Sequence, residues 1–128
     1  MILGLGVDIC DVRRMERAIR SDHFVRRVFR PEEISYADGK GKGRAASYAS
    51  AFAAREAFSK AAGVSMYKLA LSSRFCLDRS EGIPRLIVPP EVDADFSARK
   101  KLAWVSISHD GSYVVVVVAI EKAAGDLL

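Results

Sequence analysis

The chain has 128 residues, 50% of them hydrophobic, and its 20 basic and 16 acidic side chains give a net charge of +4. This size suits one compact domain over residues 1–128. Cys10 and Cys76 lie far apart, which argues against a disulfide framework and a CxxC metal site. Because no apolar run is long enough to span a membrane and no secretory signal is present, we expect a cytoplasmic protein.

The first half of the chain is predicted to form a strand followed by helices. The expected segments are a buried strand at residues 2–8 and helices at residues 12–20, 24–29, 31 onward and 45–62. Asp11 is placed to cap the first helix, and Pro31 suits the first turn of the third. Residues 45–62 are alanine-rich, contain no Gly or Pro and precede Gly63, so they predict the longest helix.

The second half is predicted to be rich in strands. The expected segments are strands at residues 70–78, 84–88, 104–109 and 113–121 and a short helix at residues 91–101. Residues 79–82 have a composition typical of a turn, and Asp110-Gly111 is a dipeptide typical of the tight turn of a β-hairpin. The order of elements predicts an α+β fold in which a long central helix packs on a mostly antiparallel sheet.

Two acidic residues are candidates for a metal or phosphate site. Asp8 ends a hydrophobic strand, where a carboxylate emerges at the rim of a sheet, although a role as a helix cap or turn residue would also explain it. Glu56 and Lys60 are four residues apart and project from one helix face. They form either an ordinary surface pair or, because flanking alanines allow another element to approach, a partly buried pair that needs a metal or phosphate partner.

The segment 105–111 places hydroxyls and an imidazole beside a turn. Ser106 and Ser108 alternate onto one strand face and His109 lies where the strand meets the turn, so these residues are candidates for binding a phosphate or nucleotide. A serine hydrolase is disfavoured, because sequence neighbours on a strand point to opposite faces and no GxSxG motif is present. The basic, glycine-rich loop 38–44 lacks the GxxxxGK[ST] spacing of a Walker motif.

Arginine is concentrated near the N-terminus. Seven arginines lie within 18 residues, namely Arg13, Arg14, Arg17, Arg20, Arg26, Arg27 and Arg30. In residues 12–20, helical spacing separates arginines from an apolar face, as in an amphipathic helix. The cluster fits a solvated helix face, a surface for an acidic partner protein, or a surface for a nucleic-acid backbone.

Three segments together carry a family resemblance. They are Gly6-Val7-Asp8, the sequence Phe-Ala-Ala-Arg-Glu-Ala-Phe-Ser-Lys-Ala from Phe52, and Val-Ser-Ile-Ser-His from Val105. In order and spacing, over nearly the whole chain, they resemble the holo-acyl-carrier-protein synthases, the small AcpS-type members of the 4′-phosphopantetheinyl transferase family. The resemblance implies the fold of that family and transfer of 4′-phosphopantetheine from coenzyme A to a serine of apo-acyl carrier protein. It further implies Mg²⁺ as cofactor, release of 3′,5′-ADP, a part in fatty acid biosynthesis, and a homotrimer with shared active sites.

The resemblance implies a role for each matching residue. Asp8 and Glu56 would hold Mg²⁺ together with a pyrophosphate oxygen of coenzyme A, and Lys60 would contact the phosphate. Glu56, directly or through a water, is the first candidate for the general base, and Asp8 is the second. The residues implied for coenzyme A are Asp8, Arg44, Glu56, Lys60, Gly63, Ser108 and His109. Those implied for the acidic carrier protein are Arg14, Met15, Arg20 and Arg27.

The chain differs from the common pattern of the family at three positions. Relatives often have Gly-Arg before the helix phenylalanine, whereas this chain has Ser-Ala before Phe52. An arginine expected to bind a nucleotide phosphate is therefore missing, and Arg44 or Lys42 could replace it. Arg55 replaces a lysine before the helix glutamate, and Trp104 replaces a histidine before the Val-Ser-Ile segment.

Two other functions would each explain part of the sequence. A small nucleic-acid-binding domain would use the arginines, but the chain has no RNP-like aromatic motif and no zinc-ligand spacing. A structural oligomerisation module would use the apolar strands, yet it leaves the acidic pair and Lys60 without a role. We therefore expect an enzyme that does not bind nucleic acid and has no membrane-spanning segment.

Overall fold

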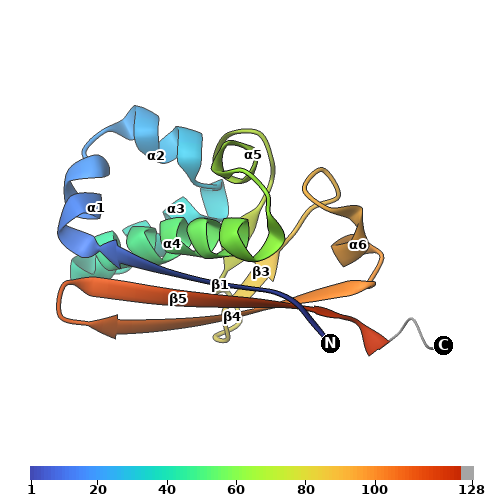
Figure 1. Ribbon diagram of the computed structural model, residues 1–128. Coiled ribbons are helices and arrows are strands. Elements are labelled where there is room, and N and C mark those ends of the chain that lie inside the picture. Colours follow the sequence, from blue (N-terminus) through green and yellow to red (C-terminus); the bar gives the residue numbers. More distant parts are fainter. Residues whose placement is uncertain (125–128) are drawn as a thin grey trace.

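The computed structural model describes residues 1–124, in which a long helix lies across an antiparallel sheet (Figure 1). The elements are β1 (Ile2–Asp11), α1 (Val12–Ala18), α2 (Asp22–Val28), α3 (Pro31–Asp38), η1 (Gly41–Gly43), α4 (Arg44–Ala62), α5 (Met66–Leu71), β2 (Cys76–Asp78), β3 (Arg85–Ile87), α6 (Ala94–Ser97), β4 (Lys101–Asp110) and β5 (Tyr113–Lys122). The predicted α+β fold is confirmed. The last four residues of the predicted domain 1–128 lie outside the described part.

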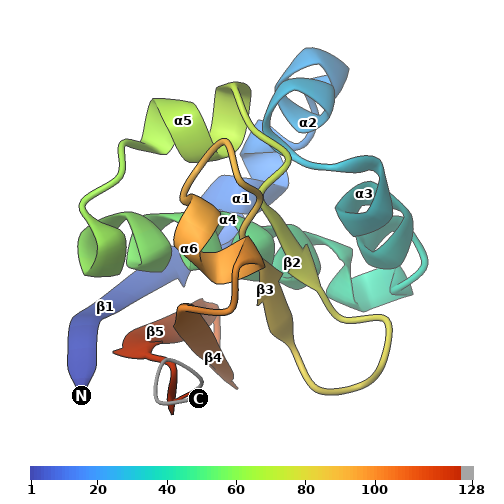
Figure 2. The ribbon, with the colours of Figure 1, turned by 90° about the vertical axis from the view of Figure 1, so that its right-hand side faces the viewer.

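The main sheet has three strands in the order β1-β5-β4, and both of its pairings are antiparallel. Side chains along β5 alternate between its two faces, and Val114, Val116, Val118 and Ile120 are buried on the face that carries α4. Helices α2 and α5 lie beyond α4, away from the sheet (Figures 1 and 2), so α4 runs through the centre of the molecule.

No helix within residues 1–124 is both long and apolar enough to cross a membrane.

Two glycines of β1 bring this strand against α4. A Cβ atom at Gly4 would overlap the carbonyl oxygen of Ala61, and one at Gly6 would overlap that of Ala57. Only glycine fits at either position without moving the helix away from the strand. Asp8 comes next on the same face of β1, because side chains alternate along a strand. The close contact at the two glycines therefore places Asp8 beside α4.

Several predicted boundaries were wrong. β1 continues to Asp11, so Asp8 lies within the strand and not at its end. The strand predicted at 70–78 is a strand only from Cys76, because residues 66–71 form helix α5, capped by the Ser65 hydroxyl and anchored by buried Leu69. A short apolar run does not by itself distinguish a strand from a helix. The helix predicted at 91–101 is reduced to residues 94–97, and Lys101 already belongs to β4.

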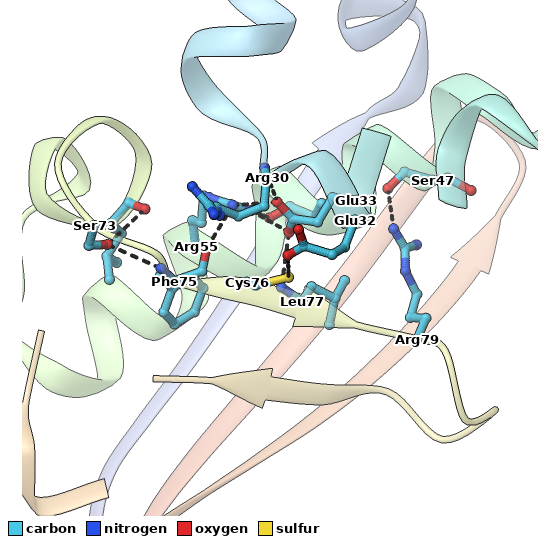
Figure 3. A network of polar contacts seen from close by, with 12 residues as sticks. Arg30, Glu32, Glu33, Ser47, Arg55, Ser73, Phe75, Cys76, Leu77 and Arg79 are labelled. Carbon is cyan, nitrogen blue, oxygen red and sulfur yellow. Dashed lines mark hydrogen bonds and ion pairs between the residues drawn. The ribbon is translucent and has the colours of Figure 1, made fainter. Parts of the chain in front are cut away.

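A fully buried ion pair joins α3, α4 and β2 (Figure 3). Arg55 and Glu33 have side-chain exposures of 0%, and the guanidinium donates to both carboxylate oxygens. Arg55 also donates to the carbonyl oxygen of Phe75, and Glu33 accepts from the backbone N–H groups of Arg30 and Leu77. The arginine that departs from the family pattern is thus a structural residue, and its fork-shaped guanidinium reaches partners that a lysine could not reach together.

Candidate functional site

Asp8 and Lys60 meet where β1 passes over the C-terminal half of α4. The Lys60 Nζ atom lies 3.3 Å from Asp8 Oδ1 and donates to the carbonyl oxygen of Val7 at 2.9 Å. The Asp8 side chain is 18% exposed and that of Lys60 is 55% exposed. Because a backbone carbonyl holds the ammonium group, Lys60 is positioned beside the carboxylate and still open to a ligand.

Glu56 precedes Lys60 by one helical turn and faces the same side of α4. The pKa of its carboxyl group is raised, first by burial and then by the negative charge of Asp8, while Lys60 acts in the opposite direction. Two carboxylates thus approach each other in a site that water reaches only in part. Such a pair gains stability from a bound cation.

The two carboxylates suit Mg²⁺. This ion is usually held by one or two carboxylates, with substrate phosphates and waters completing its six ligands. Within residues 1–124, no three His, Cys, Asp or Glu side chains converge as a metal cage would require. A metal ion held by Asp8 and Glu56 would need further ligands from waters or from a bound molecule.

The acidic pair opens into a cleft of about 440 Å³ between the end of β1, α1 and α4. Phe24 and Phe52 form apolar parts of its wall, and Arg14 adds a positive charge. Met15 also lines the cleft but is only 5% exposed, so it belongs mainly to the core. The predicted metal ligands and two of the residues implied for the carrier protein thus lie in one cleft.

Arg14, Arg20 and Arg27 are exposed on the segment from α1 to α2. In the described part of the chain, none of these three arginines forms a salt bridge. Two of their neighbours are paired: Arg13 contacts Asp11, and Arg26 contacts Asp22. The arginines implied for the carrier protein are therefore available to an acidic partner.

The residues implied for the nucleotide side of coenzyme A are dispersed. Ser108 pairs with Val115 on the outer face of the sheet, whereas His109 pairs with the buried Val114 and lies on the inner face. His109 lines a second cleft of about 360 Å³, which shares no lining residue with the first. Arg44 forms a salt bridge with Asp38 at 2.7 Å. Within a single chain, Arg44, Ser108 and His109 therefore do not line the cleft that holds Asp8 and Glu56.

Gly63 ends α4 in a left-handed conformation, with a φ angle of 70°. A Cβ atom there would have no neighbour within 4 Å, so open space lies beside this residue. The position one turn beyond Lys60 is therefore open at the surface, and contact of Gly63 with coenzyme A stays a prediction.

Two cationic residues of the second cleft were not predicted as site residues. Lys40 belongs to the glycine-rich loop, and Arg79 follows strand β2 in a segment expected to be only a turn. The basic composition of residues 38–44 was the available signal for Lys40. No local pattern marks Arg79, because its position depends on the packing of the β2-β3 hairpin beside α4.

Known proteins of one family match this chain over nearly its full length. The model of the 4′-phosphopantetheinyl transferase superfamily (ACPS) matches residues 4–118. A holo-[acyl-carrier-protein] synthase from Leptothrix cholodnii is 36% identical, with 94% of this chain and 97% of that protein covered. One from Anaeromyxobacter dehalogenans is 38% identical, with 96% and 98% covered.

Solved structures show the same similarity. The holo-[acyl-carrier-protein] synthase (AcpS) from Neisseria meningitidis matches with a TM-score of 0.80 and 27% identity, covering 95% of this chain and 100% of its own. A holo-(acyl-carrier-protein) synthase from Bacillus anthracis, solved in complex with CoA (3′,5′-ADP), matches with a TM-score of 0.75 and 29% identity, covering 96% and 99%.

Proposed function

We propose that this chain, which belongs to the holo-[acyl-carrier-protein] synthases of the 4′-phosphopantetheinyl transferase superfamily, carries out the reaction of that family with Mg²⁺ held by Asp8 and Glu56. The enzyme transfers 4′-phosphopantetheine from coenzyme A to a serine of apo-acyl carrier protein, releases 3′,5′-ADP and serves fatty acid biosynthesis. The observation that carries the proposed site is the meeting of Asp8, Glu56 and Lys60 at the junction of β1 and α4.

The three side chains have distinct tasks in this proposal. Asp8 and Glu56 hold Mg²⁺, which when bound offsets negative charge on the pyrophosphate of coenzyme A. Lys60 is held by the Val7 carbonyl and directs its ammonium group at the phosphate as negative charge shifts to the leaving oxygens. Glu56, directly or through a water that it orients, is the first candidate to receive the proton of the attacking serine, because it lies in the same cleft as the proposed metal site, and Asp8 is the second candidate.

Mg²⁺ should raise the thermal stability of the metal-free protein at pH 7, and Glu56→Gln should abolish the effect. The pKa of Glu56 is raised in the folded state, so the folded state favours the protonated carboxyl group. Without metal, the stabilisation from this group is present below the unfolded-state pKa and is lost as pH rises through the higher folded pKa. Mg²⁺ should restore folding stability at higher pH because it binds the ionised carboxylate of Glu56. Glutamine carries no charge and does not titrate, so the Glu56→Gln variant should show neither the pH dependence nor the effect of Mg²⁺.

Differential scanning fluorimetry with Mg²⁺ and with EDTA, repeated from pH 4 to pH 8, measures both effects. Glu16→Gln is the matched control, because Glu16 is exposed on α1 outside the cleft. Equal Mg²⁺-dependent shifts in wild type and Glu56→Gln would rule out Glu56 as a ligand.

A homotrimer with shared active sites is part of the proposal. The outer face of the sheet, opposite α4, exposes the apolar side chains Leu5 (67%), Val7 (53%), Ile9 (62%), Leu102 (40%), Trp104 (58%) and Val117 (38%). Such a large apolar surface is characteristic of an interface between subunits.

Val7→Lys should convert the trimer to a monomer without unfolding the chain. Val7 is central on the outer face, opposite Val117, and its exposure in the single chain means that lysine fits there. In a trimer interface, the introduced ammonium group would be buried without a partner. Light scattering gives the molar mass, and Tyr67→Lys on α5 is the control for an equally exposed site away from the sheet. A monomeric wild type, or a trimeric Val7→Lys variant, would contradict the proposed interface.

The unpaired arginines support docking of an acidic carrier protein beside the first cleft. Arg14 lines that cleft, and Arg20 and Arg27 continue the positive surface along the α1–α2 segment. Complementary charge of this kind speeds encounter and orients the partner. A nucleic-acid-binding domain would use the same arginines but leaves the acidic pair without a role.

The unpaired thiols of Cys10 and Cys76 support the proposed location in the reducing cytoplasm.

A further inference from the structure

Among residues 1–124, Arg55 has the largest fully buried side chain, and it directly precedes Glu56 on α4. Successive residues of a helix project about 100° apart, so Arg55 faces α3 and β2 while Glu56 faces the first cleft. Arg55 and its partner Glu33 are both 0% exposed, and neither lines that cleft. This ion pair therefore touches no substrate, yet it lies one residue from a proposed metal ligand.

Stability alone is a weak reason for a charged pair at this place in the core. Burial of two charges carries a desolvation cost, and well-packed apolar side chains often stabilise a core as much as a buried ion pair does. The cost is larger here, because the Nε atom of Arg55 is buried without a hydrogen-bond partner in the described chain. Apolar side chains would not provide direction, whereas the guanidinium donates to both oxygens of Glu33 and to the carbonyl oxygens of Phe75 and Ala51 (Figure 3).

The central part of α4 has few other side chains that could fix the helix in place. Between residues 49 and 57, every buried residue except Arg55 is alanine or serine. Where α4 meets β1, it packs against the two glycines of that strand, so backbone lies against backbone. Small residues allow this close approach, but they form no ridges that would interlock and oppose a slide or a rotation of the helix. The directional hydrogen bonds of Arg55 oppose both motions.

We propose that Arg55 and Glu33 are positioning residues, which fix the rotation and the axial position of α4 and thereby the geometry of the proposed metal site. This inference rests on the proposed function. Glu33 is itself held in place, because its carboxylate accepts from two backbone N–H groups outside α4. Asp8 comes from β1 and Glu56 from α4, so a shift of the helix against the strand changes the distance between the two ligands. A displacement of about 1 Å in such a site can cost about 100-fold in rate.

Metal binding and phosphopantetheine transfer by variants of Arg55 test this inference. Mn²⁺ replaces Mg²⁺ as a paramagnetic probe, because it takes the same oxygen ligands, and electron paramagnetic resonance without substrates gives its dissociation constant. For Arg55→Met, we expect this constant to rise about 10-fold and kcat to fall about 10- to 100-fold. Arg55→Lys keeps the charge but cannot bond Glu33 and Phe75 together, so both of its values should lie between those of wild type and Arg55→Met.

The double variant Glu33→Gln with Arg55→Met separates positioning from stability. It should be more stable than Arg55→Met, because no uncompensated charge remains in the core. Its Mn²⁺ dissociation constant and its kcat should nevertheless stay as impaired as those of Arg55→Met, since the directional bonds are still absent. Leu69→Ala is the control for lost stability, because Leu69 is buried on α5 and takes no part in the ion pair. This control should keep both values close to those of wild type at a temperature at which it is folded.

The outcomes distinguish this inference from the proposed function. Wild-type values in Arg55→Met, or a recovery of both values in the double variant together with its stability, would show that the ion pair serves only the fold. An equal loss of Mn²⁺ affinity in Leu69→Ala would also overturn the inference, because any loss of stability would then disturb the site. If Arg55→Met does not fold, Arg55→Lys and the double variant provide the same comparison. In these cases the proposed function stands, whereas a wild type that transfers no phosphopantetheine overturns both.

Discussion

Glu56→Gln is expected to lower kcat for phosphopantetheine transfer by about 100- to 1,000-fold, the usual cost of losing one preorganised electrostatic group. Glutamine has nearly the same shape as glutamate, so α4 and its packing should be preserved. What is lost is one of the two charges proposed to hold Mg²⁺, together with the carboxylate proposed to accept the serine proton. Asp8→Asn should cause a loss of similar size, because it removes the other metal ligand.

The comparison of two variants separates metal binding from proton transfer. If Glu56 acts mainly as a ligand, excess Mg²⁺ should partly restore Glu56→Gln and Asp8→Asn alike. If Glu56 is also the base, excess Mg²⁺ should restore Asp8→Asn more fully. Transfer is measured by chromatography of apo- and holo-carrier protein, with Glu16→Gln as the control for a lost surface charge. A Glu56→Gln variant with wild-type kcat would exclude the acidic pair from catalysis.

Arg55→Met is expected to destabilise the fold by about 3–5 kcal/mol, the cost of breaking a buried ion pair. Methionine approximates the length of the arginine stem but leaves the Glu33 carboxylate buried with backbone N–H donors alone. It also removes a donor from the carbonyl oxygen of Phe75. The links from α4 to α3 and β2 are therefore lost together.

Urea unfolding at one fixed protein concentration measures this change, since a trimer makes stability depend on concentration. The double variant Glu33→Gln with Arg55→Met should cost less than the sum of the single changes, because it removes the uncompensated charge. Arg26→Ala, which breaks an exposed pair with Asp22, should change stability by less than about 1 kcal/mol. A loss equally small for Arg55→Met would show that the pair contributes little to the fold.

Features set by local pattern were predictable from the sequence. Helix α4 follows from its composition and from Gly63, and the placement of Glu56 and Lys60 on one helix face follows from helical spacing. The hairpin β4-β5 follows from alternation and a turn signal, although its tight turn is Gly111-Ser112 and not Asp110-Gly111. These features depend on residues close together in the chain.

Features set by tertiary contact were not predictable in this way. Glu33 has the position of an ordinary helix-start residue, and only the arrival of Arg55 from 22 residues away makes it part of a buried network. Asp8 was expected at a strand end, but its place beside α4 depends on the overlap that Gly4 and Gly6 avoid. Arg79 likewise reaches the carbonyl oxygen of Ser47 only because the β2-β3 hairpin packs beside α4.

The most direct test is the intact mass of an apo-acyl carrier protein after incubation with the enzyme, coenzyme A and Mg²⁺. We predict the gain of one phosphopantetheine group with wild type, no gain when EDTA replaces Mg²⁺, and little or none with Asp8→Asn within the same time. A mass gain that persists in EDTA and with Asp8→Asn would contradict a metal-dependent reaction at the Asp8–Glu56 pair.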